Sequence, residues 1–509
     1  GKYQDAAKMY AKANRVQKAM EMFSDLRQFE QAKVWAENFA KSKGDSSSVQ
    51  ELMQRQAEWS EEVNDYQAAA DMYLKVKNYD KAINILGKQG NTNMIIDIAR
   101  ALPKTEVLKV DVYLPYARWR CDQDRFEEAR VAFKEAGHPE RSELLLQQLT
   151  HNAVLEKRFD EAAHYFWSMA IECLSRVQSP LGSCTKAEQK SVAQFYDLYE
   201  KSEIYYAYHY IYLNINMPFK SGGDTSVLFN QARFIYTKLA SREAPMGVSV
   251  VNVLYALATN GEKLGVYKLA RTALGKLQAL KVPPSWQDAV DLASIVVRGK
   301  PFIDAEELLP VCYRCGTPNP LVSGRNRQGS RGNGAGFAGE SCVNCGQTMI
   351  RSFLTFDLLP LVEFFVEDGI NDEEALALLK AEPVNHSTSH RVNGDDFHEQ
   401  HVPGDVNVLR FDDPMDMVPL NMDDPFSQQL AVAKSPVVAN RDMLRSLKRS
   451  EVFIRRWPSP AIKTQYFRSM DTDIPILVGK CGHFYEQEEN EVTLQERGGA
   501  APFCKNMGD

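Results

Sequence analysis

Large apolar residues recur along the first three hundred positions in a fixed pattern. An aromatic or aliphatic residue is followed by alanine three positions later and by a second large apolar residue seven positions later. The pattern begins at Tyr3, Val16, Tyr66, Tyr79, Phe126, Phe159 and Tyr267. Positions i, i+3 and i+7 share one face of a helix, and a small central alanine lets a neighbouring helix approach closely. The pattern therefore predicts stacked helix pairs.

Clusters of Gly, Pro and Ser separate these helical segments. They fall at residues 41–48, 101–105, 136–140, 179–185, 219–226 and 281–286. Successive patterns begin thirteen residues apart in places and then drift, which is typical of a degenerate tetratricopeptide-like repeat. We expect residues 1–305 to form one tetratricopeptide-like α-solenoid. Such arrays hold other proteins on a long concave surface, so the pattern favours a scaffold over an enzyme.

A short cysteine-rich segment follows the predicted solenoid. Two Cys-x-x-Cys pairs stand at Cys312, Cys315, Cys342 and Cys345, and a glycine follows each pair. Two such pairs can place four thiolates around one ion, and tetrahedral Zn²⁺ is the natural occupant. A redox dithiol or an iron–sulfur site is less favoured, because the first needs a βαβ context that is missing here. We expect a structural zinc ribbon with flanking helices over residues 306–382.

The remainder of the chain predicts less regular structure. Leu361, Phe364 and Phe365 mark an apolar face, and a helix is expected to open at Asp372. Residues 383–440 are expected to form an extended acidic linker. Residues 441–509 combine basic and aromatic residues with a degenerate zinc-knuckle-like module. The predicted fold class is thus mostly α, with a zinc ribbon and an irregular, partly β C-terminal module.

A second metal site is conceivable near the C-terminus. Cys481, His483 and Cys504 are acceptable ligands, but they are one short of a closed site. The alternative is a small fold held by apolar residues, with spare thiols.

Arginines interleave with aromatic residues between positions 450 and 470. Arg455, Arg456 and Arg468 could grip an acidic partner, a membrane headgroup or RNA. The simpler account is that this segment packs on the acidic linker or on a partner subunit.

Charge and hydropathy narrow the class of protein. The formal net charge of −7 argues against a chain that binds nucleic acid. No apolar run reaches the roughly 18–20 residues of a membrane span. The chain starts without Met in a helical pattern, so we expect it to be the C-terminal portion of a longer protein.

Four segments together resemble one known family. They are LLPVCYRCGTPNPL, SCVNCGQTMI, LVEFFVEDGINDEEA and FIRRWPSPAIKTQYFRS. They are similar to the C-terminal half of the intraflagellar transport protein 122 family, whose members carry two propellers before such helices. The resemblance implies zinc ligation by Cys312, Cys315, Cys342 and Cys345. Members of the family also have two Cys-x-x-Cys motifs near the C-terminus. This chain keeps only the second cysteine of each motif, Cys481 and Cys504, because Val478 and Ala501 stand at the first positions.

The resemblance also implies a function. Family members are non-enzymatic scaffold subunits of the intraflagellar transport A complex, which supports retrograde transport, cilium assembly and ciliary entry of membrane cargo. The implied partners are other A-complex subunits, met through the solenoid and the tail, with membrane cargo or its adaptors contacted indirectly. The implied location is the cilium, the basal body at its base and the cytoplasm.

Two other functions stay open. A vesicle-coat-like trafficking subunit would share the architecture. A ubiquitin ligase component is less favoured, because a RING domain needs about eight ligands and only six cysteines from 312 onward plus His483 are available.

Overall fold

The computed structural model describes residues 2–13, 15–35, 47–88, 106–216, 224–240, 242–322, 341–380, 436–489 and 491. The predicted linker therefore lies almost wholly outside the described residues, as does Cys504. The chain divides into two compact units, residues 1–149 and residues 150–509.

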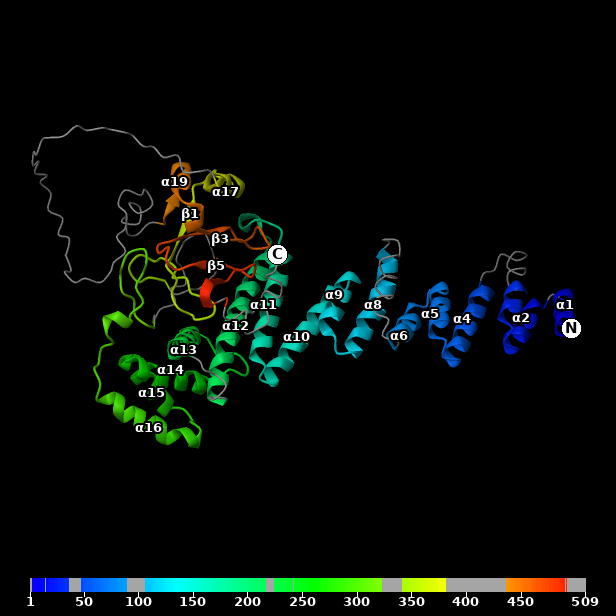
Figure 1. Cartoon of the computed structure of the whole chain (residues 1–509), viewed down its shortest axis with the longest axis horizontal. Helices are drawn as coiled ribbons and strands as arrows, with labels where there is room; N and C mark the ends of the chain where they lie inside the picture. The colour runs from blue at the N-terminus through cyan, green and yellow to red at the C-terminus, as the bar shows by residue number, and fades with distance from the viewer. Residues whose placement is uncertain are drawn as a thin grey trace, which may run out of the picture. The chain divides into compact units, whose positions relative to one another are not determined.

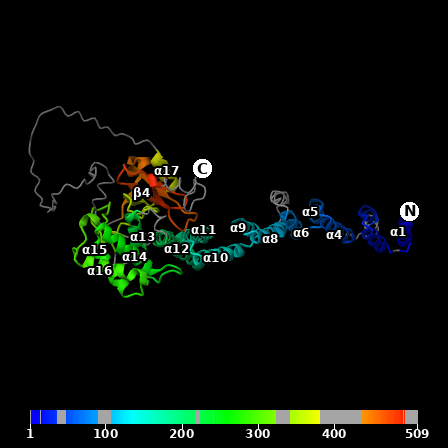
Figure 2. The same ribbon diagram turned by 60° about the horizontal axis from the view of Figure 1, so that its bottom comes forward.

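The first unit consists of helices in succession (Figures 1 and 2). The helices are α1 (Lys2–Lys12), α2 (Val16–Asp25), α4 (Ser47–Glu62), α5 (Tyr66–Lys75), α6 (Tyr79–Lys88), α8 (Glu106–Asp122) and α9 (Phe126–Glu135), followed by α10 (Pro139–Leu155), which continues into the second unit. Helices that are neighbours in sequence pack on one another, as α4 on α5 and α8 on α9 do.

The apolar pattern of the sequence marks the helix starts and the core. In every repeat except the first, the leading residue of the pattern is the first residue of a helix. The central alanine is fully buried in these repeats, at Ala19, Ala69, Ala82, Ala129, Ala162 and Ala270. The first repeat departs from the pattern, since Tyr3 and Tyr10 are exposed.

The thirteen-residue spacing has a backbone cause. Asn64, Lys77 and Asp124 each adopt a left-handed φ, of 64°, 61° and 57°, two residues before the next helix begins. At one such turn the Asn78 N–H donates to the Tyr73 carbonyl at 2.9 Å, which closes the end of α5. A ten-residue helix plus this three-residue turn gives the thirteen-residue repeat.

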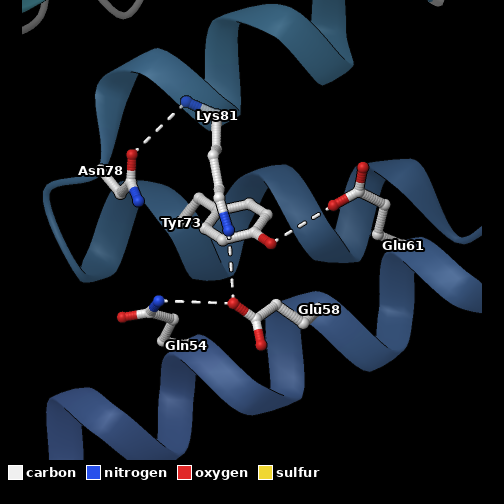
Figure 3. A network of polar contacts seen from close by, with 6 residues as sticks. All are labelled: Gln54, Glu58, Glu61, Tyr73, Asn78 and Lys81. Atoms are coloured by element: carbon white, nitrogen blue, oxygen red, sulfur yellow. Dashed lines mark hydrogen bonds and ion pairs between the residues drawn. The ribbon is translucent and has the colours of Figure 1, made fainter.

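A polar network ties α4, α5 and α6 together (Figure 3). The Lys81 ammonium lies 3.3 Å from Glu58 and 5.3 Å from the centre of the buried Tyr73 ring, and the Tyr73 hydroxyl donates to Glu61 at 3.3 Å. Burial raises the pKa of Tyr73, and the hydrogen bond with Glu58 raises the pKa of Lys81. Both side chains therefore keep their neutral-pH protonation states, a tyrosine hydroxyl and a lysine ammonium.

The second unit begins with six long helices. They are α11 (Phe159–Ser175), α12 (Lys186–Asn216), α13 (Thr225–Leu239), α14 (Val250–Leu264), α15 (Tyr267–Gln278) and α16 (Pro284–Arg298). The buried rings of Tyr205, Tyr206 and Tyr208 on α12 belong to the main core of this unit. The same core includes Phe353 and Tyr485, so helices and C-terminal module share it. Short 3₁₀ helices lie at Leu181–Ser183, Glu306–Leu308 and Arg449–Glu451.

The C-terminal module contains a small mixed sheet and a hairpin. Its elements are β1 (Leu361–Val366), α17 (Asp372–Lys380), β2 (Val438–Ala439), α19 (Arg441–Ser446), β3 (Val452–Arg455), β4 (Gln465–Ser469), β5 (Ile476–Val478) and β6 (Phe484–Glu486). The sheet order is β2-β1-β4-β3, with β1 and β2 parallel and the other pairs antiparallel, while β5 and β6 form the hairpin. The predicted fold class, mostly α with a partly β C-terminal module, is confirmed.

The expectation of an apolar face at Leu361, Phe364 and Phe365 is wrong. Residues 361–366 form strand β1 and do not present one shared apolar face: Phe364 is buried, while Phe365 beside it is 36% exposed. Successive side chains of a strand point to opposite sides, which separates these two rings. Of the flanking helices expected over residues 306–382, the described residues contain the α-helix α17 and the short 3₁₀ helix at Glu306–Leu308.

Arg455 is also not available to grip a partner. Its guanidinium is buried, donates to Gln465 at 2.8 Å and lies 5.4 Å from the ring centres of Phe467 and Phe484. Arg468 pairs with Glu451 at 3.3 Å, and only Arg456 of the three arginines is exposed. None of the described helices combines the length and apolar character needed to cross a membrane.

Candidate metal centre

The first cysteine pair lies on a tight turn over residues 311–318. Val311 pairs with Pro318 in a single antiparallel bridge, and the Cys312 N–H donates to the Thr317 carbonyl at 3.0 Å. The Gly316 N–H donates to the Cys312 carbonyl at 2.8 Å, and the left-handed φ of 66° at this glycine turns the following residue, Thr317, back toward Cys312. The turn aims both sulfurs to one side.

The second pair repeats this geometry over residues 341–348. Ser341 pairs with Thr348, and the Cys342 N–H donates to the Gln347 carbonyl at 2.9 Å. Gly346 has a φ of 73° and donates to the Cys342 carbonyl at 3.0 Å. The two turns, which we call the first and second knuckles, are therefore equivalent.

Asn319, which the sequence did not single out, joins the two knuckles. Its buried side chain donates to the Thr317 carbonyl at 2.8 Å and accepts the Val343 N–H at 2.8 Å. Asn344 adds a bond from its exposed amide to the Thr317 hydroxyl at 3.1 Å. An asparagine directly after a Cys-x-x-Cys-Gly-Thr-Pro turn is the sequence feature that could have indicated this role.

The knuckles bring all four predicted ligands together. The Sγ atoms of Cys312, Cys315, Cys342 and Cys345 lie within 4.8 Å of one another. The Cys312–Cys345 and Cys315–Cys342 sulfurs are 3.6 and 3.5 Å apart. Metal–sulfur bonds of about 2.3 Å in a tetrahedron place sulfurs about 3.8 Å apart, so the cluster fits one ion of this type.

The protonation of these thiols indicates why a cation belongs here. Burial raises the pKa of Cys312, and it raises the pKa of Cys345 to about 11. At Cys315 burial acts in the same sense, but hydrogen bonds with Thr317 outweigh it and lower the pKa to about 6. Four thiolates in one partly buried place repel one another, so holding all four requires a bound metal ion. Four sulfurs complete a tetrahedron and leave no position for water or substrate.

A third knuckle follows without any cysteine. Over residues 351–358 Arg351 pairs with Leu358, the Ser352 N–H donates to the Asp357 carbonyl at 2.8 Å, and Phe356 adopts a φ of 60°. Ser352 and Thr355 stand where the other knuckles carry cysteine. This knuckle packs apolar side chains in place of metal: Phe353 stacks on Tyr206 with ring centres 4.4 Å apart.

The predicted second site remains a prediction. Cys504 lies outside the described residues, and the four-cysteine cluster is the one metal-capable group found within the described part of the chain. The buried Cys481 lies 3.1 Å from the Tyr485 hydroxyl. The His483 ring stacks on Tyr199, with ring centres 5.1 Å apart, and lies tilted against Phe353, with ring centres 4.0 Å apart. Burial, with a smaller contribution from Arg455, holds the pKa of His483 well below its usual value, so this ring is neutral in the core.

Comparison with protein families agrees with this architecture. A family model described as the IFT122 zinc ribbon domain matches residues 305–362, and one described as the IFT122 TPR domain matches residues 106–252. A model of the TPR domain of intraflagellar transport proteins 140 and 172 matches residues 1–149.

Curated relatives match along the whole chain. The chain is 34% identical over 569 residues to the intraflagellar transport protein 122 homologues of Danio rerio and Mus musculus, and 35% identical over 566 residues to that of Xenopus tropicalis. These alignments cover 99–100% of this chain and 45% of each relative, so the chain spans less than half of their length. The chain is therefore similar, over its whole length, to part of the intraflagellar transport protein 122 homologues.

Proposed function

We propose that this chain is part of a non-enzymatic scaffold subunit of the intraflagellar transport A complex. The observation that carries the proposal is similarity to intraflagellar transport protein 122 homologues over the entire chain. The helical array and the closed cysteine site support it, since both suit a protein that holds other proteins and not one that turns over a substrate. The finer roles follow from the resemblance: retrograde transport, cilium assembly and entry of membrane cargo, exercised in the cilium, at its basal body and in the cytoplasm.

Zn²⁺ is the ion we propose for the cysteine cluster. Thiolate sulfur and tetrahedral geometry favour zinc among the common divalent ions, and the ion would be held by Cys312, Cys315, Cys342 and Cys345. Its contribution is structural. Zinc binding in isolated zinc-finger peptides is worth about 10–16 kcal/mol, so the ribbon would fold with its ion.

Affinity capture from ciliated cells tests the scaffold role. The tagged chain is compared with a Cys312→Ser/Cys342→Ser variant, and bound proteins are identified by mass spectrometry. Cys184→Ser is a matched control, because this half-buried thiol lies outside the ribbon and only donates to the Ser179 and Pro180 carbonyls, at 3.4 and 3.3 Å, as serine also can.

We expect the wild type and the control to capture other A-complex subunits, and the Cys312→Ser/Cys342→Ser variant to capture smaller amounts of them. Recovery of vesicle-coat proteins or ubiquitin-conjugating enzymes in their place would overturn it and favour one of the two alternative functions.

A further inference from the structure

One twelve-residue stretch of the second unit exposes an unusual amount of apolar side chain. Helix α16 and the turn after it carry Leu292, Ile295, Val296, Phe302 and Ile303, which are 63, 67, 40, 75 and 78% exposed. No other twelve-residue stretch of the described chain exposes as many large apolar residues. We call these five residues the α16 face. Exposed apolar clusters of this kind mark interaction surfaces, whereas singly scattered residues do not.

The apolar residues of α16 lie on two opposite sides of the helix, as in helices that are buried on both sides. One side buries Val290, Ser294 and Val297, while the opposite side presents Leu292, Ile295 and Val296. A helix that is apolar on both sides is normally buried on both. Among the described elements, α16 packs mainly on α15 and α14, and it is the last helix of the array before the chain enters the ribbon (Figure 1). The array thus ends on a helix whose outer side is suited to one more helix.

The turn after α16 is held in place although its side chains are exposed. Arg271 donates to the carbonyls of Val297, Lys300 and Pro301, at 2.8, 3.0 and 3.3 Å, and its guanidinium lies 4.7 Å from the centre of the Phe302 ring. The buried Asp304 carboxylate accepts the Lys268 N–H at 2.7 Å at the start of α15. Phe302 and Ile303 are therefore presented on a fixed backbone, which reduces the entropy cost of docking a partner.

The charges along the α16 face indicate the chemistry of its partner. Four exposed carboxylates flank it along the chain and form no ion pair with any described residue: Asp288, Asp291, Glu306 and Glu307. The basic side chains in the same stretch are Arg298 and Lys300, and Lys300 already lies over the Tyr267 ring at 5.6 Å. Along this stretch acidic groups therefore outnumber basic groups, while the neighbouring Arg271 of α15 already donates to the backbone carbonyls of the turn.

We propose that the α16 face binds an amphipathic helix of a partner protein, with an apolar stripe that covers Leu292, Ile295 and Val296 and with lysine or arginine residues beside the stripe. The bound helix would continue the array by one element, as in helix-in-groove recognition. This inference goes beyond the scaffold role and does not depend on which complex the chain joins.

Purified full chain and a synthetic peptide test this proposal. The probe is a fluorescent helical peptide of about five turns, with leucines at the i, i+3, i+4 and i+7 spacing and lysines beside them. A second peptide carries glutamates in place of the lysines. Binding is followed by fluorescence anisotropy. We expect the lysine peptide to bind at least tenfold more tightly than the glutamate peptide, and Leu292→Glu/Ile295→Glu to weaken its binding at least tenfold.

The chain offers a matched control in Leu144→Glu, since Leu144 on α10 is also 63% exposed. This control should bind like the wild type. A second variant, Asp288→Asn/Glu307→Gln, should reduce the preference for the lysine peptide while it leaves α16 folded.

Three results would overturn the proposal. One is equal binding by the wild type and Leu292→Glu/Ile295→Glu. Another is sedimentation of the wild type as a dimer that this variant dissociates, which would make a second copy the occupant. The third is binding of the wild type, but not the variant, to phosphatidylserine vesicles in preference to the peptide. Because the test uses one purified chain and a synthetic peptide, its failure leaves the proposed A-complex role untouched.

Discussion

The side chain of Asn319 carries much of the contact between the first and second knuckles. It donates to the Thr317 carbonyl of the first knuckle and accepts the Val343 N–H of the second. The backbone N–H of Asn319 donates to the Pro310 carbonyl at 2.8 Å. Apart from the sulfur contacts, the Asn344 amide makes a further side-chain bond between the knuckles, at 3.1 Å and from an exposed position. At the residue scale, metal affinity therefore depends on a residue that is not a ligand.

Replacing Asn319 should weaken the metal site without removing a ligand. Asn319→Ala removes the acceptor of the Val343 N–H, which costs about 1–3 kcal/mol, whereas the Thr317 carbonyl keeps the Cys312 N–H as a donor. We expect faster loss of metal to a chelator, measured with a colorimetric zinc indicator. Asn344→Ala is the matched control, because it removes one bond from an exposed amide and should cost less than about 1 kcal/mol. Equal metal loss from the two variants would contradict the role given to Asn319.

A partly buried carboxyl gives the C-terminal module a dependence on pH. Burial, helped by the charges of Glu486 and Asp357, raises the pKa of Glu489 to about 7. The folded state holds this proton more tightly than the unfolded state, so the contribution to stability is present below about pH 4.5 and is lost as the pH rises to about 7.

Glu489→Gln should remove this loss of stability with rising pH, because glutamine stays neutral. Hydrogen exchange of the β5–β6 amides at about pH 5 and about pH 7.5, corrected for intrinsic rates, measures the local stability. We expect the fall in protection between the two pH values to be smaller in Glu489→Gln than in the wild type. The exposed neighbour Glu488→Gln should behave as the wild type does, and an unchanged difference in both variants would refute the assignment.

At the scale of elements, the helical array depends on left-handed turns made by residues other than glycine. The left-handed conformation costs L-residues about 1–2 kcal/mol relative to glycine. Lys77 has a φ of 61° and an exposed side chain, so its turn between α5 and α6 is a place where this cost can be relieved.

Lys77→Gly should stabilise this turn by up to about 1 kcal/mol. The expected result is slower hydrogen exchange of the amides of α5 and α6. Lys75→Gly, two residues earlier at the last residue of α5, should instead speed exchange, since glycine disfavours helix by up to about 1 kcal/mol. Faster exchange in both variants would mean that the turn stores no relievable strain.

The elements that the sequence predicted well are those with local determinants. Helix starts at Tyr66, Tyr79 and Phe126 followed from the alanine pattern, and the two cysteine knuckles followed from Cys-x-x-Cys-Gly. The third knuckle was missed because its positions hold Ser352, Thr355 and Phe356, and the left-handed turn at Phe356 has no glycine to mark it.

Strand β1 was missed for a different reason. Its pairing partner β4 stands about a hundred residues later, with Leu361 opposite Ser469 and Phe364 opposite Tyr466. Local periodicity cannot reveal a partner that is distant in sequence, and a short apolar run is compatible with either helix or strand. The burial of Arg455 follows from the same sheet, because β3 pairs with β4 and places this guanidinium in the core of the module.

On the scale of the whole molecule, the ribbon is joined to the helices of the second unit through α13. Arg233 donates to the Leu321 carbonyl at 3.0 Å, Gln231 donates to the Leu354 carbonyl at 3.4 Å, and Asn230 is hydrogen-bonded to Asp357. These bonds hold the segments on both sides of the second knuckle. The metal site and the helical core of this unit should therefore be coupled.

Removal of the metal should loosen the second unit and leave the first unchanged. We expect chelation to speed hydrogen exchange in residues 341–358 and in α13. The amides of α4, α5 and α6 serve as the internal control, because their core belongs to the first unit. Uniform loss of protection in both units would contradict this division, and no change in α13 would contradict the coupling.

The account as a whole depends on one ion held by Cys312, Cys315, Cys342 and Cys345. Zinc K-edge X-ray absorption of the purified chain, combined with metal quantification, tests this most directly. The account predicts zinc in a shell of four sulfurs at about 2.3 Å, lost together with the bound zinc in Cys312→Ser/Cys342→Ser. A chain purified without chelators that holds no zinc, or zinc that the double variant retains in full, would contradict it.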